Sequence, residues 1–298
     1  MAVENVVRTL MSSYVQTHIS LNLPYNMPDF TTLNEKLGTQ VGVKPQTNQR
    51  MAFNFFSIGF GGARNVIGGD GTHLQVPRQH ETTDFSPFAI MPFVVRELNN
   101  DLSAAQRARF CLRVQATNQR DNKQYIFYYG RWFNQFEGPV QMTQFRIENG
   151  NVVDVSPFVP GDANINPTPR DLTNSGLNIV DGRYVRTSIL SDVSFSDWDV
   201  AELVNAAVIT KGSENYAFFN ELAVGAAVKN PTNVQTPGAG SFTYDEAIAA
   251  TCTNLLNVNY QALYFRDGFE VKLNFGSTEP LFRVERQSTD GMGVQLNA

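Results

Sequence analysis

The chain has 298 residues, of which 42% are hydrophobic and 17% are charged, and its formal net charge is −5. This length fits one large domain or two smaller ones. No basic patch stands out, which argues against binding to a phosphate backbone. No stretch approaches the roughly 20 apolar residues of a membrane-spanning helix, so we expect a soluble protein with no nucleic-acid partner and no membrane span. The two isolated cysteines, Cys111 and Cys252, form neither a disulfide framework nor a zinc pattern.

The first fifty residues are predicted to form an N-terminal helix and then an extended arm. Apolar residues recur at spacings of three and four between Val3 and Tyr14, as on one face of a helix. Prolines then interrupt a long irregular stretch that holds one short helical piece, indicated by Leu33 and Leu37. The stretch is either a loop laid over the protein's own surface or an arm that orders against a neighbouring subunit, and its length favours neither.

Residues 51–156 are predicted to form a β-rich domain. Alternating or aromatic-rich runs indicate strands at Met51–Phe60, Ile90–Arg96, Phe110–Ala116 and Gln124–Phe133. Ser103 and Gln106 have the spacing of a capping box, which predicts a short helix before the third of these strands. The turn sequence Glu148-Asn-Gly-Asn151 predicts a hairpin of Val140–Ile147 with Val152–Val155.

Residues 157–183 are rich in Pro, Asn, Asp and Gly and are predicted to form an exposed loop or linker. Residues 184–298 are predicted to form a second β-rich part with helices. Its expected strands are Tyr184–Phe195, Tyr216–Val228 and Leu281–Arg286, and residues 230–241 are an expected loop. Its expected helices run from a cap at Ser196 to about Ile209 and over Tyr244–Leu256. The pair Asp267-Gly268 predicts a hairpin of Ala262–Arg266 with Phe269–Phe275.

Together these elements predict a β-rich α+β protein. We expect antiparallel sheets or a sandwich, with several hairpins, three or four helices and long irregular arms.

The motifs predict no catalytic, metal-binding or cofactor-binding residue. Residues 59–64 begin like a dinucleotide-binding fingerprint, but Arg64 replaces its third glycine. His80, with Asp84 and the more distant His73, matches no known metal-ligand spacing. The acidic residues that follow Ser196 are explained by helix capping and the helix dipole. We therefore expect a protein that is not an enzyme and that needs no cofactor.

Arginine and aromatic residues gather between residues 96 and 132. Interspersed acidic residues favour ion pairs or a protein interface over nucleic-acid binding, and both Arg and large aromatic residues are common at interface hot spots. The predicted interface residues are Arg96, Arg107, Arg113, Tyr128, Trp132 and Trp198.

Several segments between about residues 50 and 230 carry a family resemblance. They are Pro92-Phe-Val-Val-Arg96, Asp101-Leu-Ser103, Arg109-Phe-Cys-Leu-Arg113, Gln124-Tyr-Ile-Phe-Tyr-Tyr129, Asp197-Trp-Asp199 and Phe219-Asn-Glu-Leu-Ala-Val-Gly225. In this combination the chain resembles an uncharacterised family of tailed-bacteriophage virion structural proteins. The resemblance implies a subunit in the baseplate or neck of a contractile tail, with no catalytic residues to carry over. It also implies assembly in the host cytoplasm with other virion proteins and with copies of itself in a symmetric ring.

Two other functions stay open on the residues alone. One is a carbohydrate-binding or other ligand-binding virion module, for which Trp132, Tyr128, Trp198 and Asp199 are candidates. Glycoside hydrolysis would in addition need two carboxylates held about 5 to 9 Å apart. The other is a head decoration or connector protein.

Overall fold

The computed structural model describes residues 3–27, 32–67, 73–133, 136–148, 151–161, 183–236, 240–262 and 267–280. Unit 1 of the chain holds Met1–Asn134 and Ser194–Glu270, and unit 2 holds Gln135–Val193 and Val271–Ala298. The predicted β-rich α+β class with antiparallel sheets is confirmed. The predicted parts 51–156 and 184–298 differ from these units, because each unit joins segments that are distant in the sequence.

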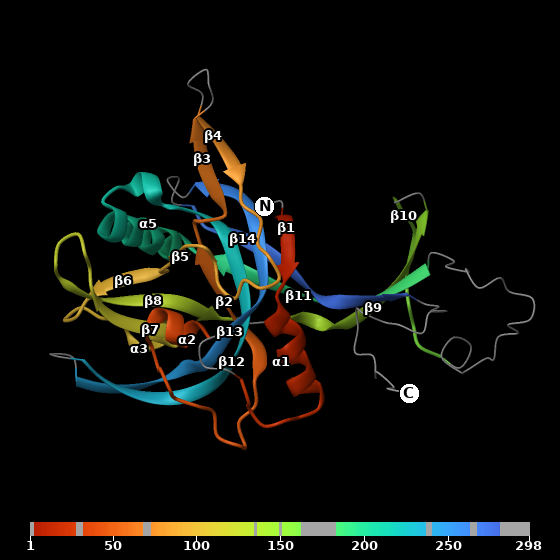
Figure 1. The fold of residues 1–298 in the computed structure, drawn as a ribbon, viewed down its shortest axis with the longest axis horizontal. Helices are drawn as coiled ribbons and strands as arrows, with labels where there is room; N and C mark the ends of the chain where they lie inside the picture. Colours follow the sequence, from red (N-terminus) through yellow and green to blue (C-terminus); the bar gives the residue numbers. More distant parts are fainter. Residues whose placement is uncertain are drawn as a thin grey trace, which may run out of the picture. The chain divides into compact units, whose positions relative to one another are not determined.

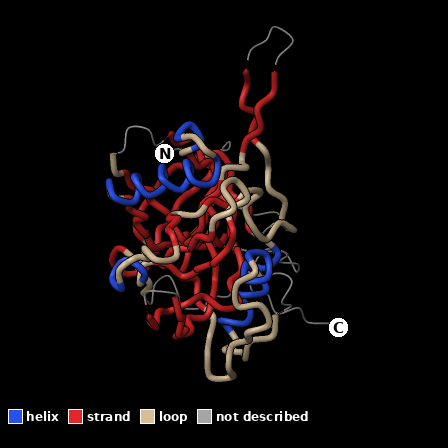
Figure 2. The backbone as a smooth tube through the Cα atoms, turned by 90° about the vertical axis from the view of Figure 1, so that its left-hand side faces the viewer, coloured by secondary structure: helices blue, strands red, loops and turns tan. Residues whose placement is uncertain are grey.

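Unit 1 is built on an eight-stranded sheet with the strand order β1-β13-β12-β2-β8-β6, to which β5 adds beside β2 and β7 beside β8 (Figure 1). The strands are β1 (Val3–Arg8), β2 (Ala52–Gly59), β5 (Ile90–Met91), β6 (Val94–Glu97), β7 (Phe110–Thr117), β8 (Gln124–Trp132), β12 (Phe218–Thr236) and β13 (Gly240–Ala262). The short strands β3 (Ala63–Ile67) and β4 (His73–Pro77) form a separate hairpin that projects from unit 1 in both ribbon and tube views (Figures 1 and 2).

Small apolar side chains let both faces of the central strands be covered. On β12 and β13, neighbouring residues such as Ala226 and Ala227 are both buried, although their side chains point to opposite faces. Ala227 belongs to a cluster with Phe55 and Trp132, whereas Ala226 packs in a cluster with Val15 of the first helix. The helices of unit 1 accordingly lie on the outside of its strands (Figure 2).

The helices of the described residues are α1 (Leu10–Ser20), α2 (Leu33–Leu37), α3 (Ala104–Arg107), α5 (Asp197–Lys211) and the 3₁₀ turn η2 (Glu214–Tyr216). The predicted capping box of Ser103 and Gln106 is confirmed at α3. The predicted cap at Ser196 is also confirmed, because its hydroxyl accepts the backbone N–H of Asp199 at 3.3 Å.

The prediction of one helix over Val3–Tyr14 is wrong in its first half. Residues Val3–Arg8 form β1, which pairs with β13, and Thr9 caps a helix that begins only at Leu10. The alternating spacing of three and four does not separate a strand from a helix over so few residues. Pairing with a neighbouring strand therefore decides the structure here.

The predicted helix over Tyr244–Leu256 and the predicted loop over residues 230–241 are also wrong. Both fall in the hairpin of β12 with β13, apart from residues 237–239, which lie outside the described part of the chain. A strand that is buried on both faces shows no alternation, so its pattern resembles that of a buried helix. Ala249, with φ of 53°, adds a β-bulge that disturbs the alternation further.

The irregular stretch before residue 50 packs on the protein's own sheet. The buried side chain of Asn34 donates to the carbonyl of Ala247 at 2.8 Å and accepts the N–H of Ala250 at 2.7 Å. These two backbone groups flank the bulge at Ala249. The structure thus favours the loop laid over the chain's own surface for this part of the predicted arm.

Unit 2 is built on a four-stranded sheet with the order β10-β9-β11-β14. Its strands are β9 (Glu137–Glu148), β10 (Asn151–Pro157), β11 (Arg183–Phe195) and β14 (Phe269–Pro280). The predicted hairpin of β9 and β10 is confirmed, with Asn151 opposite Glu148. Of the hairpin predicted at Asp267-Gly268, the second strand falls in β14, which pairs with β11, whereas residues 263–266 of the first strand lie outside the described residues. Most of the predicted loop over 157–183, namely residues 162–182, lies outside the described residues. The predicted strand Leu281–Arg286 lies wholly outside them.

Candidate functional site

Half of the predicted interface residues lie in the interior of unit 1. Arg113, Tyr128 and Trp132 are buried, and Tyr128 is 0% exposed. The carboxylate of Asp101 holds two of them, since it accepts the hydroxyl of Tyr128 at 2.5 Å and a guanidinium N–H of Arg113 at 3.2 Å. In the chain by itself these three side chains are packed inside rather than exposed, so their contacts within unit 1 account for them, and their role at an interface stays a prediction.

The other three predicted interface residues are half-buried and have partners within the chain. Arg96 forms an ion pair with Glu202 of α5. The guanidinium of Arg107 lies 3.7 Å from the ring centroid of Phe242. The ring of Trp198 lies 5.4 Å below the guanidinium of Arg109. These contacts account for the arginine and aromatic residues as internal structure.

The candidates for a carbohydrate site are likewise occupied. Asp199 is buried and accepts two hydrogen bonds of 2.7 Å from Arg109, while Arg131 lies 3.6 Å away. Burial raises the pKa of Asp199, but the two guanidinium groups outweigh this effect and the pKa is lowered. This carboxylate is therefore a stable anion that anchors α5 rather than a group free to bind a sugar.

His80, which the sequence analysis weighed as a metal ligand, is buried between two carboxylates of the chain. Its Nδ1 lies 3.0 Å from Asp84 and its Nε2 lies 2.9 Å from Glu221. Glu221 also accepts the backbone N–H groups of Gly61 and Phe88. Among the described residues no group of His, Cys, Asp and Glu side chains is arranged to hold a metal ion.

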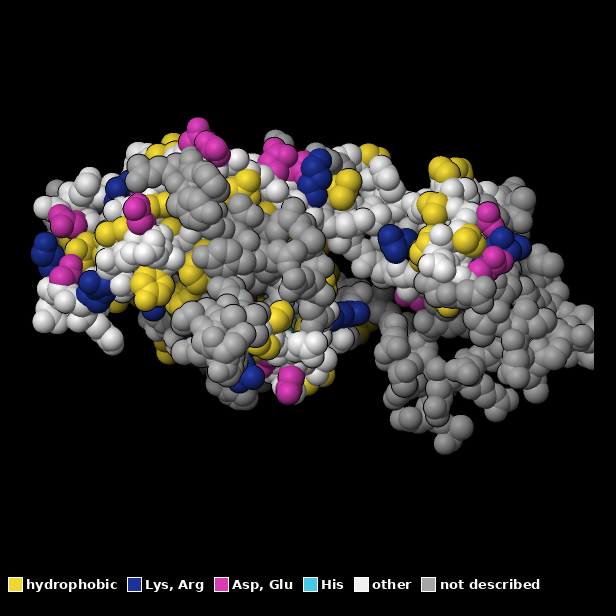
Figure 3. Space-filling model, turned by 90° about the horizontal axis from the view of Figure 1, so that it is seen from above, with side chains coloured by type: hydrophobic (Ala, Val, Ile, Leu, Met, Phe, Trp, Pro, Cys, Tyr) yellow, Lys and Arg dark blue, Asp and Glu magenta, His cyan; other side chains and the backbone are white. Residues whose placement is uncertain are grey.

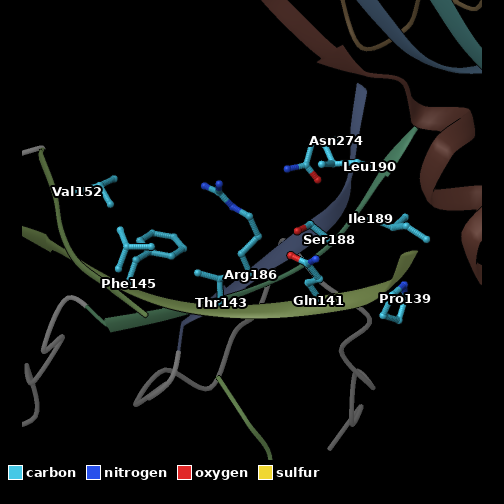
Figure 4. A pocket seen from close by; sticks show the side chains of 11 residues that line it. Pro139, Gln141, Thr143, Phe145, Val152, Arg186, Ser188, Ile189, Leu190 and Asn274 are labelled. Carbon is cyan, nitrogen blue, oxygen red and sulfur yellow. The ribbon is translucent and has the colours of Figure 1, made fainter. Parts of the chain in front are cut away.

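The concave side of the unit 2 sheet surrounds a hollow of about 280 Å³. In Figure 4 the side chains of β9, β11 and β14 point into it together. Hydrogen-bonding side chains supply one part of its wall: Gln141, Thr143, Arg186, Ser188 and Asn274. Apolar residues supply the rest: Pro139, Phe145, Val152, Val155, Ile189 and Leu190.

Cross-strand pairing brings these residues to one face. Arg186 of β11 stands opposite Thr143 of β9, and Ser188 stands opposite Gln141. Paired residues point to the same face of a sheet. On β10, Asp154 has φ of 51° and lies in a bulge. The extra residue turns Val155 to the side of the hollow.

Exposed apolar side chains border this hollow. Val152 is 56% exposed and Val155 is 64% exposed, and Ile147 and Leu190 are also exposed. In Figure 3 hydrophobic side chains of unit 2 lie at the surface among a few charged ones. Single exposed apolar residues are ordinary, but a group of them around a concave face is typical of an interaction site. We call this face, with its hollow, the unit 2 surface.

Unit 1 has a hollow of similar size, also about 280 Å³. Its walls are mostly apolar and include Phe60, Met91 and Tyr129. The ammonium group of Lys211 lies 4.8 Å from the ring centroid of Phe60. Lys211 beside this hollow therefore serves as a control for Arg186, the cation in the hollow of unit 2.

The chain is thus a β-rich α+β protein, and the sheet of its unit 2 has a partly apolar concave face. Residues 1–289 match the model of a family of unknown function (DUF7208), and the chain belongs to this family. Searches of the curated proteins and of the solved structures give no match. Within the described residues, no helix combines the length and the apolar character needed to cross a membrane.

Proposed function

We propose that this chain is a non-catalytic structural subunit of a tailed-phage virion that assembles through its unit 2 surface. The partners would be copies of the chain in a symmetric ring and other virion proteins of the baseplate or neck. The phage setting rests on the sequence resemblance. The role in protein–protein assembly is supported by one observation, the exposed valines on the concave face of the unit 2 sheet.

The proposed contact has a simple physical basis. Val152 and Val155 keep more than half of their surface in water. Covering such a half-exposed side chain with a partner contributes about 1 kcal/mol, from roughly 25 cal/mol per Å² of apolar surface. Both valines belong to β10, which lies at one end of the sheet order. Its bulge and the ion pair of Arg146 with Asp154 are features that discourage uncontrolled strand addition at an edge. A partner is therefore expected to cover the face of this sheet rather than to extend it.

The test is the association state of the full chain by light scattering and sedimentation. We expect the wild type to self-associate with rising concentration. The double variant Val152→Asp/Val155→Asp should remain monomeric, because two carboxylates would be buried in the contact without partners. Val41→Asp is the control, since Val41 is 61% exposed in unit 1 and should associate like the wild type. A wild-type chain that stays monomeric up to its solubility limit contradicts the proposed self-assembly.

A further inference from the structure

We infer that the unit 2 surface binds an extended protein segment that places a carboxylate side chain at Arg186, flanked by apolar side chains on Val152 and Leu190. This inference rests on the proposed function and specifies the chemistry of its partner.

Arg186 carries the only charge in the wall of the hollow, among the described residues that line it. Its side chain is exposed, and its guanidinium lies 5.1 Å from the ring centroid of Phe145. In Figure 4 it points from β11 into the open space. Within the described part of unit 2, Arg186 has no carboxylate partner, whereas Arg146 pairs with Glu148 and Asp154. A guanidinium in such a hollow attracts an anion.

The surroundings of Arg186 favour a carboxylate on a peptide over other anions. A guanidinium stacked on an aromatic ring keeps its planar donor fork oriented, and this fork matches a carboxylate in a bidentate pair. A nucleic-acid backbone would need a series of cations, but acidic Glu148 and Asp154 lie on the same unit. The apolar wall formed by Val152, Val155 and Leu190 suits the side chains on either side of the acidic residue.

The size of the hollow sets the size of what it holds. A volume of about 280 Å³ is just below the range of small-molecule sites, which occupy roughly 300–1,000 Å³. The amides of Gln141 and Asn274 and the hydroxyls of Thr143 and Ser188 can meet backbone groups of an extended segment. The occupant is therefore one or two side chains of a partner rather than a large cofactor.

The experiment is an NMR titration of the full-length protein with three short peptides. The probes are acetyl-Val-Glu-Val-amide and its counterparts with Gln and with Lys in the centre. We expect the Glu peptide to shift the Nε–Hε signal of Arg186 and backbone amides of β9 and β11. The Gln peptide should bind about tenfold more weakly, which corresponds to one charge-assisted hydrogen-bonded pair, and the Lys peptide should not bind.

Variants locate the effect at the guanidinium. Arg186→Gln should weaken binding of the Glu peptide about tenfold, and Arg186→Lys should lie between the two because a single ammonium cannot form the bidentate pair. Lys211→Gln, which removes the cation beside the unit 1 hollow, should bind like the wild type. Equal binding of the Glu and Gln peptides, no binding of any peptide, or an unaffected Arg186→Gln variant would each overturn the inference.

The same samples separate this inference from the proposed function. If Arg186→Gln self-associates like the wild type while Val152→Asp/Val155→Asp does not, and the peptides do not discriminate, the inference fails and the proposed function stands. If the wild type stays monomeric, the proposed function fails whatever the peptides do.

Discussion

In unit 1, Nε2 of His80 lies 2.9 Å from a carboxylate oxygen of Glu221, and both side chains are 1% exposed. Asp84 lies 3.0 Å from the other ring nitrogen, so each ring nitrogen faces a carboxylate, an arrangement that favours the protonated imidazole, in which both nitrogens donate. The ring of Phe88 stacks on His80 at 4.0 Å between centroids, and Arg78 lies 4.7 Å over Phe88. The buried charge of Glu221 is thereby matched, and the segment before β5 is fastened to β12.

The first prediction concerns pH. Burial lowers the pKa of His80, but the hydrogen bonds to Glu221 and Asp84 prevail and raise it from 6.5. A raised folded-state pKa means that its contribution to stability is complete below 6.5 and is lost as the pH rises through the folded value. Urea unfolding across this range should show stability falling with rising pH.

His80→Gln should be less stable at low pH and should lose most of this pH dependence, because the residue no longer titrates. His18→Gln serves as the control and should retain the wild-type slope. The same slope in His80→Gln and in the wild type would contradict the assignment of the effect to this cluster.

The second prediction concerns the buried carboxylate of Asp101. Its side chain is 2% exposed and lies 3.2 Å from Arg113. Asp101→Ala leaves the buried guanidinium of Arg113 and the hydroxyl of Tyr128 without this acceptor, so we expect a loss of about 3–5 kcal/mol in the free energy of unfolding. Tyr128→Phe removes only one hydrogen bond and should lose about 1 kcal/mol. Equal losses in the two variants, measured by chemical denaturation, would show that the ion pair adds nothing.

The third prediction tests close packing between β12 and β2. A Cβ at Gly225 would collide with the ring of Phe55 and would lie 2.8 Å from the carbonyl oxygen of Thr251. Gly225→Ala should therefore destabilise the protein by about 1–3 kcal/mol, because the packed core cannot give way. Gly161→Ala, where an added Cβ meets nothing within 4 Å, should unfold at the wild-type denaturant concentration. A stable Gly225→Ala variant would mean that β2 and β12 lie farther apart.

The fourth prediction concerns the anchoring of the irregular stretch before residue 50. Asn34→Ala removes the partners of Ala247 and Ala250, and we expect a loss of about 1–3 kcal/mol. Hydrogen exchange should also become faster at the amide of Ala250. Unchanged protection at that amide would indicate that this stretch does not fix the bulge of β13.

Local signals predicted the local structure well. Capping residues placed the start of α3 and of α5, and the turn at residues 148–151 placed the β9–β10 hairpin. The errors arose where distant strands decide the outcome. Residues Tyr244–Leu256 look helical because both faces of β13 are buried, and that burial depends on its neighbours β1 and β12.

The candidate site was missed for the same reason. The sequence predicted the strands that contain Thr143 and Arg186, but not that they pair with each other. That pairing places Arg186 beside Phe145 in a hollow whose wall, as far as the structure describes it, holds no acidic residue. Conversely, Arg113 and Tyr128 looked like interface residues because their common acceptor, Asp101, could not be assigned from spacing. The sequence did contain one signal for this site. The valines of β10 do not follow the strict alternation of apolar and polar residues that a strand with one buried face shows.

The chain leaves unit 1 after residue 134 and re-enters it at residue 194. Each strand of the eight-stranded sheet lies in unit 1. Residues 135–193, which belong to unit 2, therefore contribute no strand to that sheet. Substitutions that fit unit 2 to a different neighbour thus need no compensating change in the central core. If unit 2 binds partners as proposed, stability and partner choice would be set by different parts of the chain, and the attachment could diversify while the eight-stranded sheet stays the same.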